Sequence, residues 1–194
     1  MATKPGERKL QILQTLAEML EVPKGEKITT ASLAAKLDCS EAALYRHFAS
    51  KAQMFEGLID FIESSLFTLI NRINSEDANG LRQTEAILRL LLQFAETNRG
   101  MTRVLIGDAL VNENERLQTR ISALLDKVES AIKQSLRNAA AAGNISTEMD
   151  IGAAANILRC YTVGRWEQFA RSGFTRLPSA NWPQHWPLLA GVCQ

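Results

Sequence analysis

Residues 28–55 read ITTASLAAKLDCSEAALYRHFASKAQMF, and this stretch decides the fold. Two short segments of helical apolar spacing, 31–37 and 41–48, are separated by the polar turn 38–40. A threonine stands before the first segment and Ser40 before the second, and both side chains favour helix N-termini because they accept a backbone N–H. Two short helices joined by a three-residue turn are typical of a helix-turn-helix, whose second helix enters the major groove of DNA. The sequence therefore predicts a DNA-reading unit.

The side chains in this stretch suit the parts of such a unit. Hydroxyls at a helix N-terminus suit a phosphate, small alanines let a helix lie deep in the groove and touch a thymine methyl, and longer polar side chains reach phosphates or base edges. Leu33, Leu37, Leu44 and Phe48 are expected to hold the two helices against a helix over 5–21. The predicted DNA-binding residues are Thr29, Thr30, Ser40, Glu41, Ala42, Ala43, Tyr45, Arg46, His47 and Lys51.

The remainder of the chain has the apolar spacing of further helices. Ser50 opens a long helix with a capping-box pattern, and Thr147 with Asp150 repeats that pattern later. We therefore predict an all-α fold of about nine helices, with a helix-turn-helix domain over 1–52 and a helical body over 53–194. The expected helices span 5–21, 31–37, 41–48, 50–75, 81–98, 101–111, 115–142, 148–172 and 182–192.

Composition and motifs exclude several classes of protein. Apolar residues make up 46% of the 194 residues, which is enough for a core, and the net charge is only +1, so charge alone does not indicate nucleic acid. No apolar run approaches the roughly 18–20 residues of a membrane span. The three cysteines and two histidines are scattered, and no catalytic or metal-binding motif occurs. We predict a cytoplasmic protein that is not an enzyme and needs neither cofactor nor metal.

The stretch AALYRHFASK, followed by a long apolar helix, resembles the TetR family of bacterial regulators. Residues 44–48 and Lys51 of this sequence match the motif of that family position by position. The stretches ITTASLAAKL, SKAQMFEGLIDFIE, NRGMTRVLIGDAL and RLQTRI extend the resemblance to the gammaproteobacterial nucleoid occlusion proteins within that family. The resemblance implies a nucleoid-associated homodimer that binds double-stranded DNA and, when bound, antagonises assembly of the division protein FtsZ. Leu69 and Thr97 depart from the pattern, which has arginine at both positions.

Two surfaces of the body are expected to serve partners. Aromatic side chains in the last two long segments suit either a dimer interface built like a four-helix bundle or the chain's own core. The predicted dimer residues are Tyr161, Trp166, Phe169, Trp182 and Trp186. Exposed aromatic and basic side chains earlier in the body suit either a docking surface for FtsZ or ordinary solvated and packed positions. The predicted partner residues are Phe61, Phe67, Leu90 and Arg103.

A different function remains open from sequence alone. The body of a TetR-like fold can also hold a small molecule that releases the protein from DNA, and such a site is an apolar pocket with a few polar groups. The alanine run at 153–155 is compatible with tight helix packing or with a cavity. The alternative to nucleoid occlusion is therefore a small-molecule-responsive transcriptional repressor, and an enzyme is the third and weakest reading.

Overall fold

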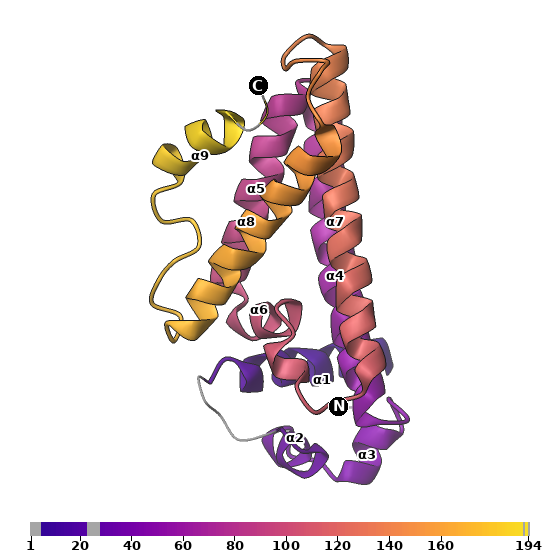
Figure 1. Ribbon diagram of the computed structural model, residues 1–194. Coiled ribbons are helices and arrows are strands. Elements are labelled where there is room, and N and C mark those ends of the chain that lie inside the picture. Colours follow the sequence, from indigo (N-terminus) through magenta and orange to yellow (C-terminus); the bar gives the residue numbers. More distant parts are fainter. Residues whose placement is uncertain (1–4, 23–27, 192, 194) are drawn as a thin grey trace. The chain divides into compact units, whose positions relative to one another are not determined.

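The computed structural model describes residues 5–22, 28–191 and 193, and within these ranges the chain forms nine α-helices and one 3-10 helix (Figure 1). The all-α fold expected from the sequence is confirmed. None of the helices in the described ranges combines the length and apolar character that crossing a membrane requires. The helices are α1 (Pro5–Leu20), α2 (Thr30–Lys36), α3 (Glu41–Tyr45), α4 (Lys51–Glu76), α5 (Gly80–Thr97), α6 (Arg99–Leu105), η1 (Asp108–Leu110), α7 (Glu115–Ala141), α8 (Ile151–Arg171) and α9 (Trp182–Gly191).

Two expected helices are shorter than the sequence pattern predicts. The second helix of the DNA-reading unit ends at Tyr45 rather than at Phe48, and a turn follows in which the backbone N–H of His47 donates to the carbonyl of Leu44, three residues back, at 2.9 Å. The helix expected over 101–111 is divided into α6 and η1. Gly107 separates them at a φ of +79°, a left-handed conformation that glycine adopts without a steric penalty.

The start of α8 also differs from the expectation. Its N-cap is Asp150, whose carboxylate accepts the N–H of Ala153 at 3.0 Å. The helix therefore begins at Ile151, three residues after the predicted start, and Thr147 does not cap it. The predicted end of the last helix, Val192, lies outside the described residues.

Contacts between residues divide the chain into two compact units, which we describe separately. Unit 1 comprises Met1–Ile62 and Asn98–Ile121, and unit 2 comprises Glu63–Thr97 and Ser122–Gln194. Unit 1 thus contains α1, α2, α3, α6 and η1, together with the first parts of α4 and α7. A functional boundary after residue 52 stays a prediction.

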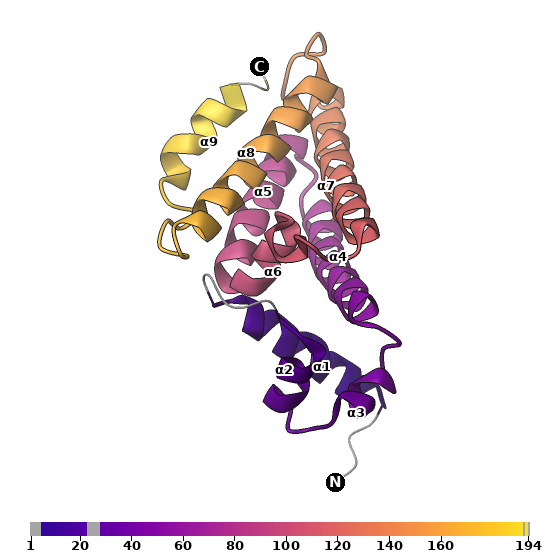
Figure 2. The ribbon, with the colours of Figure 1, turned by 60° about the horizontal axis from the view of Figure 1, so that its bottom comes forward.

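In unit 1, α1 packs against both α2 and α6, and α2 packs against α3 (Figure 2). Ile12 and Leu16 on α1 are buried, as are Leu58 and Ile59 on α4 and Leu44 on α3. Burying a leucine or isoleucine side chain contributes on the order of 1.5–3 kcal/mol. This shared core fixes the position of the short α2 and α3, which have too few residues to be stable helices alone.

In unit 2, α5 packs against α8 and α9. The core of this unit contains Leu88 and Leu91 on α5 and Leu158, Trp166 and Phe169 on α8, all fully buried. The indole Nε1 of Trp166 donates to the carbonyl oxygen of Leu91 at 3.0 Å, so the buried polar group of this large side chain is satisfied. The packing of α5 on α8 and α9 therefore encloses a core of large apolar side chains.

Candidate nucleic-acid interface

The entrance of α2 is a reciprocal cap between Thr29 and Ser32. The Thr29 side-chain oxygen accepts the Ser32 N–H and the Ser32 hydroxyl oxygen accepts the Thr29 N–H, both at 3.0 Å. This is a capping box with serine in place of the usual Glu or Gln. Of the two threonines at the start of this helix, Thr29 is therefore the cap, which leaves the hydroxyl of Thr30 for another partner.

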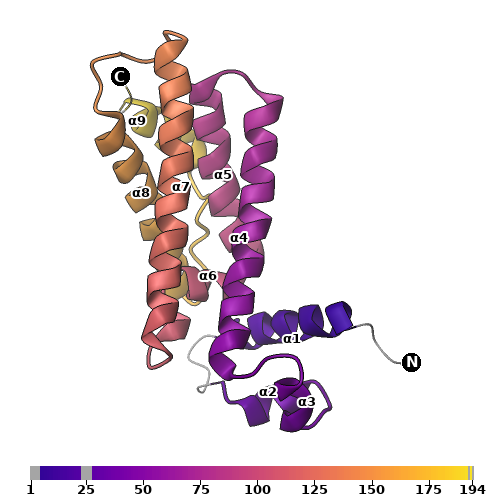
Figure 3. The same ribbon diagram turned by 90° about the vertical axis from the view of Figure 1, so that its right-hand side faces the viewer.

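Contacts between residues close in sequence also shape the turn and cap α3. Asp38 adopts a φ of +49° in the turn, and the Ser40 side chain accepts the N–H of Ala43 at 3.2 Å to cap α3. Leu33, Leu37, Leu44 and Phe48 are all buried, as expected, and α2 packs against both α1 and α3. Figure 3 shows α2 and α3 lying side by side in unit 1.

This packing leaves one face of the two helices to solvent. Tyr45 is 45% exposed although it is aromatic, whereas its neighbour Leu44 is fully buried. Of the predicted DNA-binding residues, those exposed are Thr29, Ser40, Glu41, Ala42, Tyr45 and Arg46. Those half-buried are Thr30, Ala43, His47 and Lys51. The arrangement presents a polar helix face with small alanines, which can approach base edges in the major groove.

A hydrogen-bonded chain of side chains crosses from α3 to α2 and back. The Tyr45 hydroxyl donates to the hydroxyl oxygen of Thr30 at 3.4 Å, and the Thr30 hydroxyl donates to the Glu41 carboxylate oxygen Oε2. Sequence reasoning placed these three residues on DNA but did not predict that they contact one another, since Thr30 and Tyr45 lie 15 residues apart.

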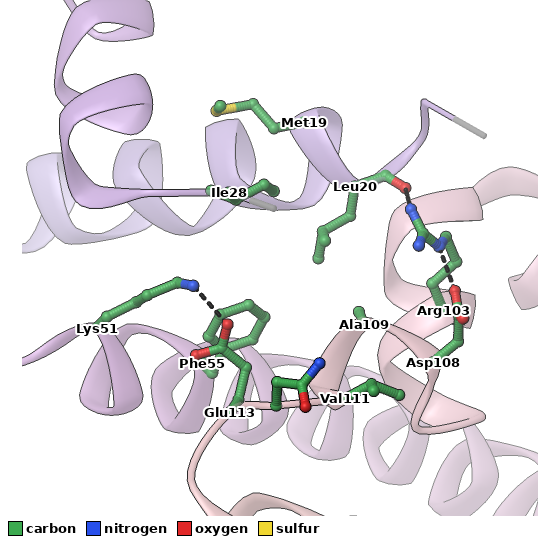
Figure 4. A pocket seen from close by; sticks show the side chains of 11 residues that line it. Met19, Leu20, Ile28, Lys51, Phe55, Arg103, Asp108, Ala109, Val111 and Glu113 are labelled. Carbon is green, nitrogen blue, oxygen red and sulfur yellow. Dashed lines mark hydrogen bonds and ion pairs between the residues drawn. The ribbon is translucent and has the colours of Figure 1, made fainter. Parts of the chain in front are cut away.

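Lys51, the expected phosphate contact at the start of α4, is engaged within unit 1. Its ammonium forms an ion pair with Glu113 and lies 5.6 Å from the centroid of the Phe55 ring. Its side chain is only 21% exposed. Figure 4 shows this ion pair at a small pocket of about 210 Å³. A phosphate contact by Lys51 therefore competes with its ion pair to Glu113.

We expect the variants Glu113→Gln and Lys51→Ala to change DNA affinity in opposite directions. Removing the Glu113 charge frees the Lys51 ammonium for a phosphate, so operator affinity should rise several-fold at low salt. Removing the Lys51 charge should weaken binding to all sequences and lower the slope of log affinity against log salt by about one unit. Fluorescence anisotropy titrations over a salt series measure both effects. An unchanged slope in Lys51→Ala would assign Lys51 to the internal ion pair alone.

Arg103, one of the predicted partner residues, is also engaged inside unit 1. Its Nε donates to Asp108 at 2.6 Å, and its Nη1 donates to the carbonyl oxygens of Leu20 and Val22 at 3.1 and 3.3 Å. The last carbonyls of a helix have no intrahelical partner, so this guanidinium satisfies the end of α1 and ties it to α6. With a side chain that is 19% exposed, Arg103 stabilises unit 1 and is not an open docking residue.

Arg103→Lys is therefore expected to destabilise unit 1 by about 1–3 kcal/mol, because a lysine ammonium cannot reproduce the planar set of donors that meets three acceptors at once. Thermal unfolding followed by circular dichroism measures this loss. Arg89→Lys, at an exposed position on α5, is the matched control and should melt like the parent. Equal melting temperatures for the two variants would contradict the structural role of Arg103.

The other predicted partner residues, Phe61, Phe67 and Leu90, are half-buried. Phe61 lines a pocket of about 400 Å³ within unit 1. The lining combines the apolar groups of Ala17 and Met101 with polar ones. The remaining lining residues are Gln14, Glu18, Glu21 and Asn98. Apolar, acidic and amide groups therefore line this pocket together.

The residues predicted for a dimer interface divide into two groups. Trp166 and Phe169 have no exposed surface in the single chain, and Trp182 has 7%. Trp166 and Phe169 are therefore core residues, and their prediction as interface residues is replaced by the alternative of intramolecular packing. Tyr161 and Trp186 are half-buried, and Tyr161 OH lies 2.8 Å from Nδ1 of His185, which links α8 to α9.

Two apolar side chains that the sequence reasoning did not select are exposed on the same helices. Ile157 on α8 is 46% exposed and Leu188 on α9 is 74% exposed. Ile157 stands directly before the buried Leu158 and therefore points away from the core stripe of its helix. That out-of-register position was visible in the sequence and is the signal that could have identified an interface residue.

Comparison with known families gives matches over most of the chain. Residues 26–58 match the family described as bacterial regulatory proteins, tetR family. Residues 78–194 match the family described as tetracyclin repressor-like, C-terminal domain, of the SlmA-like type.

Individual proteins give the same picture. The chain is 50% identical to the nucleoid occlusion factor SlmA of Alteromonas mediterranea, over 95% of each chain. It is also 50% identical to that of Idiomarina loihiensis, over 97% of this chain and 96% of the relative. Among solved structures, the fatty acid degradation regulator FadR from Bacillus halodurans superposes with a TM-score of 0.82 at 13% identity, covering 96% of each chain. At that identity the likeness shows the fold alone.

Proposed function

Because the chain belongs to the TetR family, and within it to the nucleoid occlusion factors called SlmA, it is a non-enzymatic DNA-binding protein, and on that premise we propose how it acts. It binds DNA as a homodimer through the exposed face of α3, and the DNA-bound dimer antagonises assembly of FtsZ. It works in the cytoplasm, associated with the nucleoid. Double-stranded DNA, a second copy of this chain and FtsZ are then its three partners.

The observation that carries the DNA contact is the exposed polar face of α3. Glu41 and Tyr45 on α3, and Arg46 directly after it, are exposed to solvent, while Leu44 on the same helix is fully buried. A recognition helix needs this division, because one side must fit the domain core and the other must enter the groove. The capped turn before α3 supports the same role, since it fixes the helix in one orientation.

The homodimer is supported by the exposed apolar residues on α8 and α9. Ile157 and Leu188 are large apolar side chains left in solvent in the single chain, and their burial against a second copy would be favourable. A two-fold dimer also presents two recognition helices to successive major grooves, about 34–36 Å apart on one face of the duplex. Tyr161 and Trp186 are the predicted interface residues that retain surface for this contact.

For the FtsZ contact, the pocket lined by Phe61 supports a partner segment with an apolar anchor. Phe67 and Leu90 in unit 2 retain partial exposure and remain candidate contacts of the same partner. Arg103 no longer belongs to this set, because its guanidinium is used inside unit 1. Leu69, where arginine was expected, is 38% exposed and so leaves an apolar group where a charge was expected to meet FtsZ.

The function is tested by mixing FtsZ, GTP and this protein, with an operator duplex or with a scrambled duplex, and measuring pelleted polymer after sedimentation. We expect polymer to fall with the operator duplex and to fall much less without it. Phe61→Ala should keep operator affinity and lose much of the effect on FtsZ, whereas Leu177→Ala, at an exposed loop position in unit 2, should keep both. Polymer that is unaffected by the DNA-bound parent, together with a small molecule that releases the protein from DNA, would replace this proposal by the ligand-responsive repressor.

A further inference from the structure

Glu41 is a carboxylate on a surface that must approach polyanionic DNA. It is the first residue of α3 and is exposed to solvent. Among the described residues, no lysine or arginine forms an ion pair with it. An uncompensated negative charge at this position weakens binding to phosphates in every sequence. We therefore expect Glu41 to bind a hydrogen-bond donor on the DNA, which a phosphate cannot provide.

A side-chain hydrogen bond restrains this carboxylate. The single hydroxyl proton of Thr30 is donated to Oε2 of Glu41, and the oxygen of the same hydroxyl accepts from Tyr45. A threonine hydroxyl has one proton to give, so this pattern of donors is fully determined. One carboxylate oxygen is thereby anchored, while Oε1 makes no hydrogen bond to any described residue. A side chain restrained in this way loses less conformational entropy when it binds.

The chemistry of the major groove restricts what Oε1 can accept. An ionised carboxylate only accepts hydrogen bonds, and the groove offers donors at the amino groups of cytosine and adenine. The adenine amino group stands next to the acceptor N7, which repels a second acceptor, whereas the cytosine amino group has no acceptor of its own base beside it in the groove. Guanine and thymine present acceptors to the groove at the corresponding positions, and a carboxylate is repelled by them.

We propose that Glu41 is a specificity-determining residue that accepts a hydrogen bond from the N4 amino group of a cytosine in each half-site, with Thr30 as its positioning residue. This assignment rests on the proposed binding of DNA through α3. It gives the acid a function in selecting sequence: Glu41 weakens binding to DNA in general and restores affinity only where a cytosine meets it. The Thr30 hydroxyl, which is not required for capping α2, acts by aiming the carboxylate.

A purely structural role for Glu41 makes a different prediction. An acid at the first position of a helix interacts favourably with the helix dipole, and its bond to Thr30 ties α3 to α2. If these were its only effects, Glu41→Ala would lower stability, and with it affinity, by the same factor for every DNA sequence. Base-dependent effects therefore separate the two roles. Glu115 is a matched control, because it is the first residue of α7, is exposed, and can be replaced by alanine in the same way.

The first arm of the test is selection from a randomised duplex pool, followed by sequencing, with the full-length parent and with Glu41→Ala, Thr30→Val and Glu115→Ala. We expect the parent to select a two-fold-related site that contains one cytosine position sensitive to Glu41. Glu41→Ala should lose the cytosine preference at that position by about 5- to 100-fold, with the other positions retained, and should bind unrelated DNA more tightly. Thr30→Val should lose part of the same preference, and Glu115→Ala none.

The second arm changes the DNA and not the fold. In the selected duplex, the critical cytosine is replaced by 2-pyrimidinone, which lacks the N4 amino group. The parent should lose affinity for this duplex, while Glu41→Ala should bind the two duplexes nearly equally, so that the two changes are strongly non-additive. Equal losses for the parent and the variant would overturn the assignment of Glu41 and leave DNA binding through α3 intact. A parent that selects no site at all would overturn the proposed sequence-specific binding, and the role of Glu41 with it.

Discussion

Ile157→Asp is expected to convert the dimer into monomers and to lower operator affinity by about 100-fold or more. In a two-fold interface the same residue occurs twice, so one substitution places two carboxylates in the interface. Burying unpaired charges is costly, and the interface opens instead. A monomer then loses the second half-site, which a dimer binds as an intramolecular event with an avidity of about 10²–10⁴. Because Ile157 is 46% exposed in the single chain, the fold itself should be little affected.

Sedimentation equilibrium at micromolar concentration and anisotropy titration of an operator duplex measure the two effects together. Leu188→Asp, on α9, should act in the same direction. Val111→Asp is the matched control, since Val111 is an apolar residue of unit 1 that is 61% exposed and lies on neither α8 nor α9. A variant Ile157→Asp that remains dimeric would move the interface away from this face of α8.

The sequence predicted the DNA-reading unit well because its causes are local. The caps at Thr29 and Ser40 are made within four residues of chain, and the turn between them is equally short. Leu33 and Leu44 were identified by spacing alone, since on a short amphipathic helix the apolar side can only be the buried side. The end of α3 was missed because the turn after Tyr45 preserves the apolar spacing of a helix without continuing it.

The partner surfaces were harder to predict because they depend on contacts between residues that are distant along the chain. Arg103 meets the carbonyl oxygen of Leu20, 83 residues away, and Lys51 meets Glu113, 62 residues away. The spacing of apolar residues along the sequence does not identify such distant partners. The aromatic residues of α8 show the same difficulty. Trp166 is buried and its indole N–H donates to the carbonyl oxygen of Leu91, 75 residues away, and composition cannot distinguish that core position from an interface.

The close approach of α6 to α1 within unit 1 leads to the second large expected effect. A Cβ atom on Gly100 would lie 1.9 Å from the carbonyl oxygen of Ala17 and 3.1 Å from Cβ of Leu20. Real Cβ atoms do not approach backbone this closely, so in Gly100→Ala one of the two helices must move. We expect unit 1 to be destabilised by about 3 kcal/mol, the upper end of what overpacking of a core usually costs, because the obstructing atoms belong to a helix backbone.

The same displacement of α1 or α6 should also lower operator affinity, because α1 supports α2 through the buried core of unit 1. Two matched glycines separate this effect from general instability. Gly6→Ala on α1 meets nothing within 4 Å and should leave stability unchanged or slightly raised. Gly80→Ala would place its Cβ 2.1 Å from the carbonyl oxygen of Ser135, which is an equal clash but in unit 2. We therefore expect Gly80→Ala to lower the melting temperature while its folded fraction keeps operator affinity, and Gly100→Ala to lose both. If folded Gly100→Ala bound the operator as tightly as folded Gly80→Ala, the packing of α6 on α1 would not control the position of the reading helices.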